Sequence, residues 1–224
     1  MKKLVLTIFA VIFFGCVGCN TEGKNTQSII SDSTQLIIEG GEHWLGNMKV
    51  FIFSIKKTPQ IAAWIEDAEG RYIATITVTT RSAKKNWRSS PKEGRPEALP
   101  VWNHKQQNNE SSDDIDTVST ATPKDSVEAK IDNGLLINGD TYNIYLEVNH
   151  SFDYNDYWTK DNSGVNGQPS LIYHAQFTVG VPCRIPLVPI GHGSVDGSSG
   201  NISDGLENFT SALGIVKNVY IIVK

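Results

Sequence analysis

Hydrophobic and polar residues alternate with a period of two along several stretches of the chain, which is the pattern of β-strands with one buried face. The stretches with this pattern are residues 72–79, 142–149 and 171–179. Residues 219–223 predict a last strand. Residues 50–55 and 61–65 are apolar on both faces, which predicts central strands packed between two layers. The pattern therefore predicts an all-β fold, an immunoglobulin-like β-sandwich over residues 35–224.

One helix is predicted near the end of the chain. Apolar residues recur there at the spacing of one helical face, at Leu206, Phe209, Leu213 and Val216. Asp204 can cap the first turn, and Glu207 can complete a capping box. A single short C-terminal helix is therefore expected beside the strands.

Between the two halves of the strand pattern, residues 81–137 predict a long insertion without strands. Residues 87–104 hold its tryptophans, and residues 105–125 are strongly hydrophilic. A segment that polar buries too little surface to order itself, so partial disorder is expected. Long loops in a compact domain are either functional or disordered, which makes this insertion the first place to search for a site.

The first residues have the layout of an export signal, with two lysines, an apolar run over residues 4–14 and then small residues. The run is shorter than the roughly 20 residues that span a bilayer. Val17-Gly18-Cys19 resembles a bacterial lipobox, which predicts removal of residues 1–18 and acylation of Cys19. Several acyl chains would anchor the protein stably, with residues 19–34 as a flexible tether. The expected location is extracytoplasmic, on a bacterial membrane facing the periplasm. A plain signal peptide that contains cysteines is the alternative.

Charge, cysteine content and the lack of a catalytic pattern limit the kinds of protein that this chain can be. Loss of the leader with its two lysines changes the formal net charge from −4 to −6, and this acidity argues against nucleic acid as a partner. With Cys19 acylated, Cys183 has no disulfide partner, so a buried core must hold the fold. No Ser–His–Asp or paired-carboxylate pattern is evident, so the sequence does not indicate a hydrolase.

A short motif in the hydrophilic part of the insertion reads Asp116-Thr117-Val118-Ser119-Thr120-Ala121-Thr122. It resembles the sequence recognised by FAD:protein FMN transferase, in which Asp, two residues, Ser or Thr, Gly, Ala and Thr follow one another. Asp116, Ser119, Ala121 and Thr122 match. The resemblance implies covalent FMN on Thr122 through a phosphoester bond, with Asp116 and Ser119 positioning the loop.

Thr120 departs from that motif, because it stands where glycine is usual. If φ must be positive at this position, a β-branched residue is costly there. The alternative is a surface loop rich in serine and threonine that matches by chance.

Several separated blocks carry a wider resemblance: residues 62–67, 95–104, 119–123, 145–153, 167–173 and 191–193. They resemble the predicted periplasmic proteins called domain of unknown function 2271, over about residues 35–217. The likeness implies an extracytoplasmic β domain of no established activity, with genes often near those of flavin-transfer and membrane electron-transfer proteins.

Aromatic residues concentrate at residues 152–158, directly after a predicted strand. Tyr154 and Trp158, together with Trp102 of the insertion, could stack on an isoalloxazine ring. The alternative is that these rings pack over the open end of the sandwich. Trp64 lies in an apolar strand and is expected in the core.

The histidines and a glycine-rich loop carry weaker signals. The weak metal candidates are His104, His150 and His192, but the five histidines lack metal-binding spacing, so no metal is expected. Gly191-His192-Gly193-Ser194, followed by Asp196, Gly197 and Gly200, could offer backbone N–H groups to an anion. Because the loop lacks the lysine of a phosphate-binding loop, a plain turn is favoured.

Together these patterns predict a lipid-anchored electron carrier with covalent FMN, and not an enzyme with a substrate of its own. The expected partners are FAD:protein FMN transferase and a membrane redox protein. The alternative is a structural or binding lipoprotein that presents residues 150–158 to a cell-envelope partner or a glycan.

Overall fold

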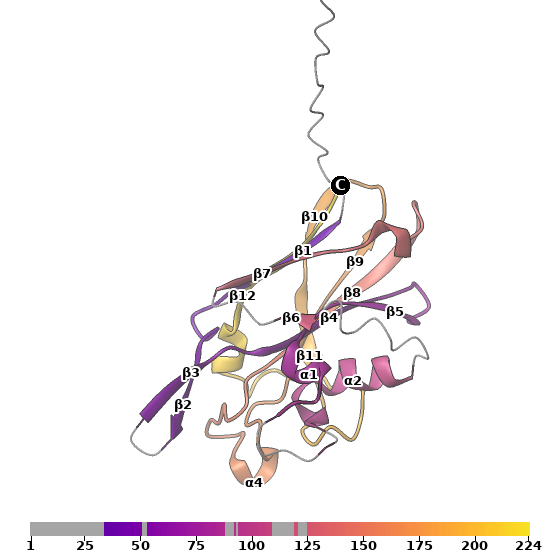
Figure 1. Cartoon of the computed structure of the whole chain (residues 1–224). Helices are drawn as coiled ribbons and strands as arrows, with labels where there is room; N and C mark the ends of the chain where they lie inside the picture. The colour runs from indigo at the N-terminus through magenta and orange to yellow at the C-terminus, as the bar shows by residue number, and fades with distance from the viewer. Residues whose placement is uncertain (1–33, 51–52, 88–91, 93, 109–118, 121–124) are drawn as a thin grey trace, which may run out of the picture. The chain divides into compact units, whose positions relative to one another are not determined.

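In the computed structural model the strands form two β-sheets that pack face to face, with a separate hairpin beside them (Figure 1). The four-stranded sheet has the order β10 (Cys183–Pro186), β12 (Val216–Val223), β1 (Gln35–Gly40), β7 (Ser126–Lys130). The six-stranded sheet has the order β11 (Val188–His192), β9 (Leu171–Thr178), β8 (Thr141–Asn149), β4 (Gln60–Glu66), β5 (Tyr72–Thr79), β6 (Ser119–Thr120). The all-β sandwich predicted from the alternation is confirmed.

The structure describes residues 34–50, 53–87, 92, 94–108, 119–120 and 125–224. The predicted leader, residues 1–18, and residues 19–33 of the predicted tether lie outside this part of the chain. Thr34, the last residue of the predicted tether, is buried, and its carbonyl accepts a hydrogen bond from the Ile131 N–H at 2.8 Å. Within the described residues, no helix is long and apolar enough to span a bilayer.

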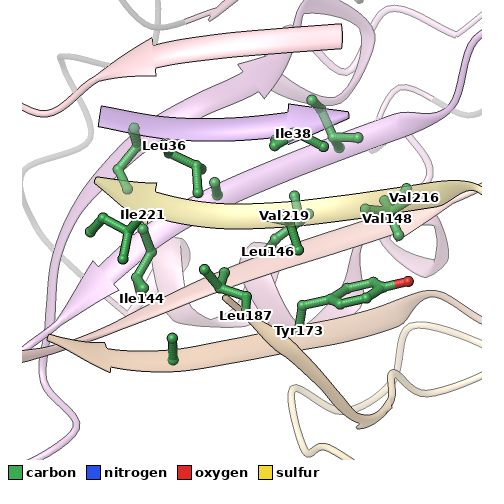
Figure 2. Packing of buried hydrophobic residues seen from close by; sticks show 14 of the residues in the cluster. Leu36, Ile38, Ile144, Leu146, Val148, Tyr173, Leu187, Val216, Val219 and Ile221 are labelled. Atoms are coloured by element: carbon green, nitrogen blue, oxygen red, sulfur yellow. The ribbon is translucent and has the colours of Figure 1, made fainter. Parts of the chain in front are cut away.

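Hydrophobic side chains from both sheets fill the space between them (Figure 2). The four-stranded sheet contributes Leu36, Ile38, Val216, Val219 and Ile221, and the six-stranded sheet contributes Ile144, Leu146, Val148 and Tyr173. Full burial of a large aliphatic side chain stabilises a fold by roughly 1.5–3 kcal/mol. This core holds the domain together without a disulfide among the described residues, where Cys183 is a free thiol.

The six-stranded sheet is covered on its outer face as well, by the first part of the insertion. Helix α2 (Pro100–Gln107), which follows the 3-10 helix η1 (Pro96–Ala98), packs over β4 and β5. A second apolar cluster forms there from Ala62, Trp64, Val78, Leu99, Val101, Trp102 and Ile172. Trp64 is fully buried and stacks on Tyr145 with ring centres 5.1 Å apart. The predictions of a two-faced central strand over residues 61–65 and of a core Trp64 are therefore confirmed.

The insertion contains strands as well as this helix, which corrects the expectation that residues 81–137 form none. β7 pairs antiparallel with β1 at the edge of the four-stranded sheet. β6 pairs in parallel with the end of β5. Val127 of β7 is buried whereas Glu128 is exposed, so β7 has the alternation of a strand. With five residues in a polar segment, it is too short for the sequence pattern to predict it.

The prediction of a central strand over residues 50–55 is wrong. β2 (Gly46–Val50) and β3 (Phe53–Lys57) are two strands of an antiparallel hairpin that projects beside the two sheets (Figure 1). A short run of apolar residues does not by itself say which sheet a strand joins or where it turns.

The predicted helix over residues 206–216 is also wrong. Residues Ser211–Gly214 form the 3-10 helix η4, and Val216 already begins β12. Leu213 is 41% exposed, so the helical spacing does not correspond to a buried face. The β-branched residues of β12 favour a strand, and its backbone groups pair with β1 on one side and β10 on the other.

Candidate functional site

The two ends of the sandwich carry different features. At the proximal end, as we call it, Thr34 lies with the turns over residues 132–140 and 179–182. At the opposite, distal end lie the loops over residues 149–170 and 191–205. The candidate functional residues that the structure describes lie mostly on the side of the distal end.

Part of the flavinylation-like motif lies at the edge of the six-stranded sheet. Ser119 pairs with Val78 and Thr120 with Thr79, at the end of β5. The other motif residues, Asp116, Ala121 and Thr122, lie outside the described residues. Thr120 therefore has the extended backbone of a strand, a conformation that suits a β-branched residue.

A small cleft lies beside helix α1 (Thr80–Ala83): Ser82 of α1 lines the cleft, and α1 contacts both β5 and β6. The cleft is lined by Ser82, Lys85, Trp87, Arg95, Pro96, Leu99, Trp102 and Asn103. The cleft is shallow and open to solvent, with room for about one water-sized group. It therefore offers a surface against which a ligand could lie and not an enclosed site.

The backbone is strained at the cleft. Lys85 has φ 51° and Phe152 has φ 60°, and these are the two non-glycine residues with positive φ in the described chain. Such conformations cost roughly 1–3 kcal/mol and cluster at functional sites. Gly94 packs against Lys85, since a Cβ on Gly94 would lie 2.9 Å from the Lys85 Cβ. Lys85 lines the cleft and is exposed to solvent.

Arg95 connects the cleft to the loop after β8. Its guanidinium carbon lies 4.9 Å from the Trp87 ring centre. Its Nη1 donates to Ser151 Oγ at 2.5 Å and its Nη2 to Asn166 Oδ1 at 2.8 Å. Its Nε donates to Glu97 Oε1 at 2.7 Å. All three donor groups are engaged within the protein, so Arg95 positions Trp87, and Lys85 is the cation of the cleft that faces solvent.

Trp102, one of the three candidates for flavin stacking, is mostly buried. Its side chain is in the second apolar cluster with Trp64, and only 3% of the residue is exposed. Its Nε1 donates to Thr75 Oγ1 at 2.9 Å. Trp102 therefore contributes to the floor of the cleft, whereas the half-buried Trp87 offers more of its ring surface.

Glu147 of β8 anchors the start of α2. Its carboxylate accepts hydrogen bonds from the backbone N–H of Trp102 at 2.8 Å and of Val101 at 3.3 Å. The Ser170 hydroxyl donates to it at 2.6 Å. These N–H groups belong to the first turn of α2, which has no partner for them within the helix. Burial raises the pKa of Glu147 to about 7, although all three donors favour the ionised carboxylate.

The other end of α2 is held by a second acid of the sheet. Lys105 Nζ lies 2.9 Å from Glu66 Oε1, and the Trp64 Nε1 donates to the same oxygen at 2.8 Å. Glu66 is almost fully buried. The helix that carries Trp102 is thus fixed to the sheet at both ends, which makes the floor of the cleft rigid.

The glycine-rich loop packs against this insertion. A Cβ on Gly193 would lie 2.5 Å from both Pro100 Cγ and Ser170 Oγ, and 3.1 Å from Glu147 Oε1. A Cβ on Gly200 would lie 2.5 Å from His104 Cβ. The glycines allow the loop to approach the insertion closely. Gly191 and His192 are the last residues of β11, so the interpretation of a plain turn is wrong for these two residues.

The aromatic segment after β8 divides into a buried and an exposed part. Trp158 packs on Phe209 and His192, with ring centres 5.7 and 5.9 Å apart, and so covers the end of the core. Phe152, Tyr154 and Tyr157 are 46%, 37% and 52% exposed. The Tyr154 hydroxyl donates to the Gly164 carbonyl at 2.8 Å. The exposed rings remain available to a partner.

Beneath these rings lie three titratable side chains, Lys57, His150 and Asp153. Burial raises the pKa of Asp153, and its carboxylate accepts hydrogen bonds from Ser211 and Gln168. Burial lowers the pKa of Lys57 to about 8. The buried Lys57 Nζ has no hydrogen-bond partner among the described residues, and it lies 5.4 Å from the Phe152 ring centre.

His150 is neutral in this environment. Its Nε2 lies 3.1 Å from the carbonyl oxygens of both His43 and Trp44, to which it donates, and its buried Nδ1 has no partner in the described part of the chain. Burial, and the nearby Lys57, lower the pKa of His150 to about 4. The ring is 4% exposed, so protonation would place a cation in a buried site.

We expect acid to destabilise the protein through His150. Its folded-state pKa of about 4 lies below the ordinary value of 6.5, so the unfolded state binds more protons in this window. Stability is therefore lost as the pH falls from 6.5 towards 4, by about 3 kcal/mol for this one residue. The His150→Gln variant keeps a side-chain donor but does not titrate. Unfolding free energies from pH 7 to pH 4 that stay parallel in the two proteins would contradict this assignment.

The three histidines considered as metal ligands each have different surroundings. His104 Nε2 lies 3.0 Å from the Gly197 carbonyl, and His192 Nδ1 lies 2.9 Å from the Gly193 carbonyl. His150 is buried, as described above. In the part of the chain that the structure describes, no three His, Cys, Asp or Glu side chains are grouped so as to hold a metal ion.

Sequence reasoning missed Trp87, Lys85, Arg95 and Lys57. Three of them lie in a segment without periodicity, and their proximity depends on how the insertion folds back over the sheet. The signal that could have identified them is chemical: a tryptophan followed by a Gly-Arg-Pro sequence within an insertion that carries the candidate modification motif.

These features define an all-β sandwich with a helix-bearing insertion that forms a cleft beside β6. Residues 54–151, which span β3 to β8 and the whole insertion, match the model of a family described as predicted periplasmic protein (DUF2271). This is narrower than the residues 35–217 over which the sequence blocks resemble that family. Neither a curated protein nor a solved structure matches the chain.

Proposed function

We propose that the protein is an extracytoplasmic lipoprotein that carries FMN covalently on Thr122 and transfers electrons at a membrane. The leader with its lipobox-like Cys19 supports export and anchoring. The similarity of residues 54–151 to a family described as predicted periplasmic supports the same location.

The observation that carries the proposal is the position of β6 beside the cleft. Thr122 follows Thr120 by two residues, so the two Cα atoms are separated by roughly 7 Å at most. Thr120 pairs with Thr79, which immediately precedes α1, and α1 contributes Ser82 to the cleft wall. A nucleotide joined to Thr122 is therefore tethered within reach of the cleft.

The attachment is a nucleotidyl-transfer step. The Thr122 hydroxyl oxygen attacks the FMN phosphorus of FAD, the bond to the AMP phosphate breaks, and AMP leaves with the transferase taking the hydroxyl proton. The loop must enter the transferase's active site for this reaction. Thr120 pairs with Thr79 at the edge of the sheet, so separation of β6 from β5 would give the transferase fuller access to the motif.

The residues of the cleft suit a flavin ring in part. Trp87 offers a ring surface for stacking, held by Arg95 on its other side. The exposed Lys85 offers a positive charge at the mouth, where it would favour a negative charge on a ligand. Bound FMN would supply the redox chemistry, while these side chains set the position and surroundings of the ring.

The test is the mass of the protein extracted from the membranes of cells that contain the FMN transferase. We expect the acylated chain plus one FMN less one water, and a fluorescent band in a denaturing gel. Thr122→Val should abolish both signals, because no hydroxyl remains at that position. Thr117→Val is the matched control, a threonine of the same loop, and should leave both unchanged. Thr120→Gly should raise the rate of modification by loosening β6.

Two results would contradict the proposal. One is the unmodified mass from cells in which a known substrate of the transferase becomes flavinylated. The other is flavin that remains on the Thr122→Val protein.

The exposed rings of Phe152, Tyr154 and Tyr157 favour a second candidate function, a binding module for a cell-envelope partner or a glycan. Aromatic faces of this kind stack on sugar rings and on partner surfaces. In that case the protein would lack flavin. Binding to envelope glycans would then decrease in the Phe152→Ala and Tyr157→Ala variants and not in Val188→Ala, whose side chain is also exposed but lies in β11.

A further inference from the structure

Apolar side chains also protrude at the proximal end, where the described chain begins. Leu135, Ile137 and Val181 are 51%, 66% and 54% exposed. They lie on neighbouring turns, because the Gly139 N–H donates to the Val179 carbonyl at 3.0 Å and the Asp140 N–H donates to the Ile137 carbonyl at 3.1 Å. Apolar side chains that gather on adjacent turns, outside the core, are typical of a contact with a protein partner or a membrane.

The position of Thr34 indicates what that environment is. Thr34 leads into β1 at this end, and its carbonyl accepts the Ile131 N–H just before the turn that carries Leu135. Cys19 precedes Thr34 by 15 residues, a distance of at most roughly 50 Å when fully extended. To bring the distal end to the lipid surface, the chain would have to run back along the roughly 30 Å length of β8. The proximal end needs no such detour.

We infer that the proximal end lies against the lipid bilayer, with Leu135, Ile137 and Val181 inserted at its interface. This inference rests on the lipid-anchor part of the proposed function and not on the flavin. It assigns the opposite direction to the distal end, whose loops and exposed rings point away from the lipid surface.

The charges around the patch indicate the kind of lipid contact. Lys130 and Lys224 are exposed at this end, and so are Asp132 and Asp140. The opposite charges balance locally, so the contact depends on apolar insertion and not on attraction to anionic headgroups. Binding should therefore be similar on neutral and anionic membranes.

The test uses the full acylated protein, reconstituted through its anchor into phosphatidylcholine vesicles. In a Cys183→Ser background, Ile137→Cys is labelled with a polarity-sensitive fluorophore, and Val165→Cys is the matched control. Val165 is 42% exposed and lies at the distal end, where its carbonyl accepts the Phe152 N–H. We expect a blue-shifted emission at position 137 and at least three-fold stronger quenching there by nitroxide lipids. Leu135→Cys should behave like Ile137→Cys.

Equal quenching at positions 137 and 165, or stronger quenching at 165, overturns the inference. A quenching difference that appears only with anionic lipid overturns the apolar contact. The intact mass of the same sample reports the acyl chains and the FMN separately. An unacylated mass therefore overturns the anchored orientation while leaving the flavin proposal to its own test, and a missing FMN leaves the orientation to be decided by the labels.

Discussion

Glu147→Ala is expected to lower the free energy of unfolding by about 4 kcal/mol, because it leaves several buried donors without an acceptor. Val101 and Trp102 would each retain an N–H that points at the removed carboxylate, and the Ser170 hydroxyl would lose its partner. The residue is fully buried, so water cannot replace the carboxylate without opening the contact between β8 and α2. Denaturant unfolding at pH 6 measures the loss.

Glu147→Gln separates the effects of charge and of hydrogen bonding. Its amide oxygen can accept one N–H, while its NH₂ faces the other, so we expect about half the loss of the alanine variant. The wild-type carboxyl has a folded-state pKa of about 7, above its ordinary 4.5, so the folded state binds more protons between these values. The wild type should therefore lose stability relative to the glutamine variant as the pH rises from 4.5 to 7. Wild-type stability in both variants would show that α2 does not need this anchor.

Trp102→Ala is expected to cost about 4 kcal/mol, in the range for removal of a buried aromatic side chain. The change leaves a cavity beside Trp64 in the second apolar cluster and leaves the Thr75 hydroxyl without the indole donor. Trp102→Phe should cost less than half as much, since most of the volume remains. Thermal unfolding of the three proteins gives the order.

Trp87→Ala is the matched comparison for Trp102, because both rings line the cleft but Trp87 is only half-buried. We expect a stability change well below that of Trp102→Ala, together with a changed flavin emission in the flavinylated protein. A Trp102→Ala protein as stable as the wild type would contradict the assignment of Trp102 to the core. Unaltered flavin emission in Trp87→Ala would contradict the proposed stacking of the flavin on Trp87.

The sequence was informative where one face of a strand alone decides burial. In β9, Leu171, Tyr173, Ala175 and Phe177 are buried and Gln176 is exposed, as the alternation predicts, whereas Ile172 of the other face is buried as well. β5 departs from this pattern in its second half, where Thr77 and Thr79 are buried along with Ile76 and Val78. The reason is that the insertion covers the outer face of β5, and no local sequence pattern predicts that cover.

The errors have a common physical origin in pairing between distant segments. Leu206 to Val216 fit a helical spacing locally. However, β12 forms its hydrogen bonds with β1 and β10, and a local sequence pattern does not include such distant partners. β7 was overlooked for the same reason, since its partner is also β1. The candidate cleft could not be predicted because Lys85, Arg95 and Trp102 meet only after the insertion folds onto the sheet. Thr122 itself was identified by motif alone, and that assignment stays a prediction.

The centre of the four-stranded sheet is formed by β1 and β12. Their pairing joins Gln35 to Ile222, two residues at nearly opposite ends of the described sequence. The ribosome synthesises β1 before β12. Until residue 222 has been added, β1 lacks one of its two neighbouring strands, and the core between the sheets is incomplete. Closing so long a loop is slow compared with local folding. The core between the two sheets can therefore be completed only after β12 has been made, however early the six-stranded sheet forms.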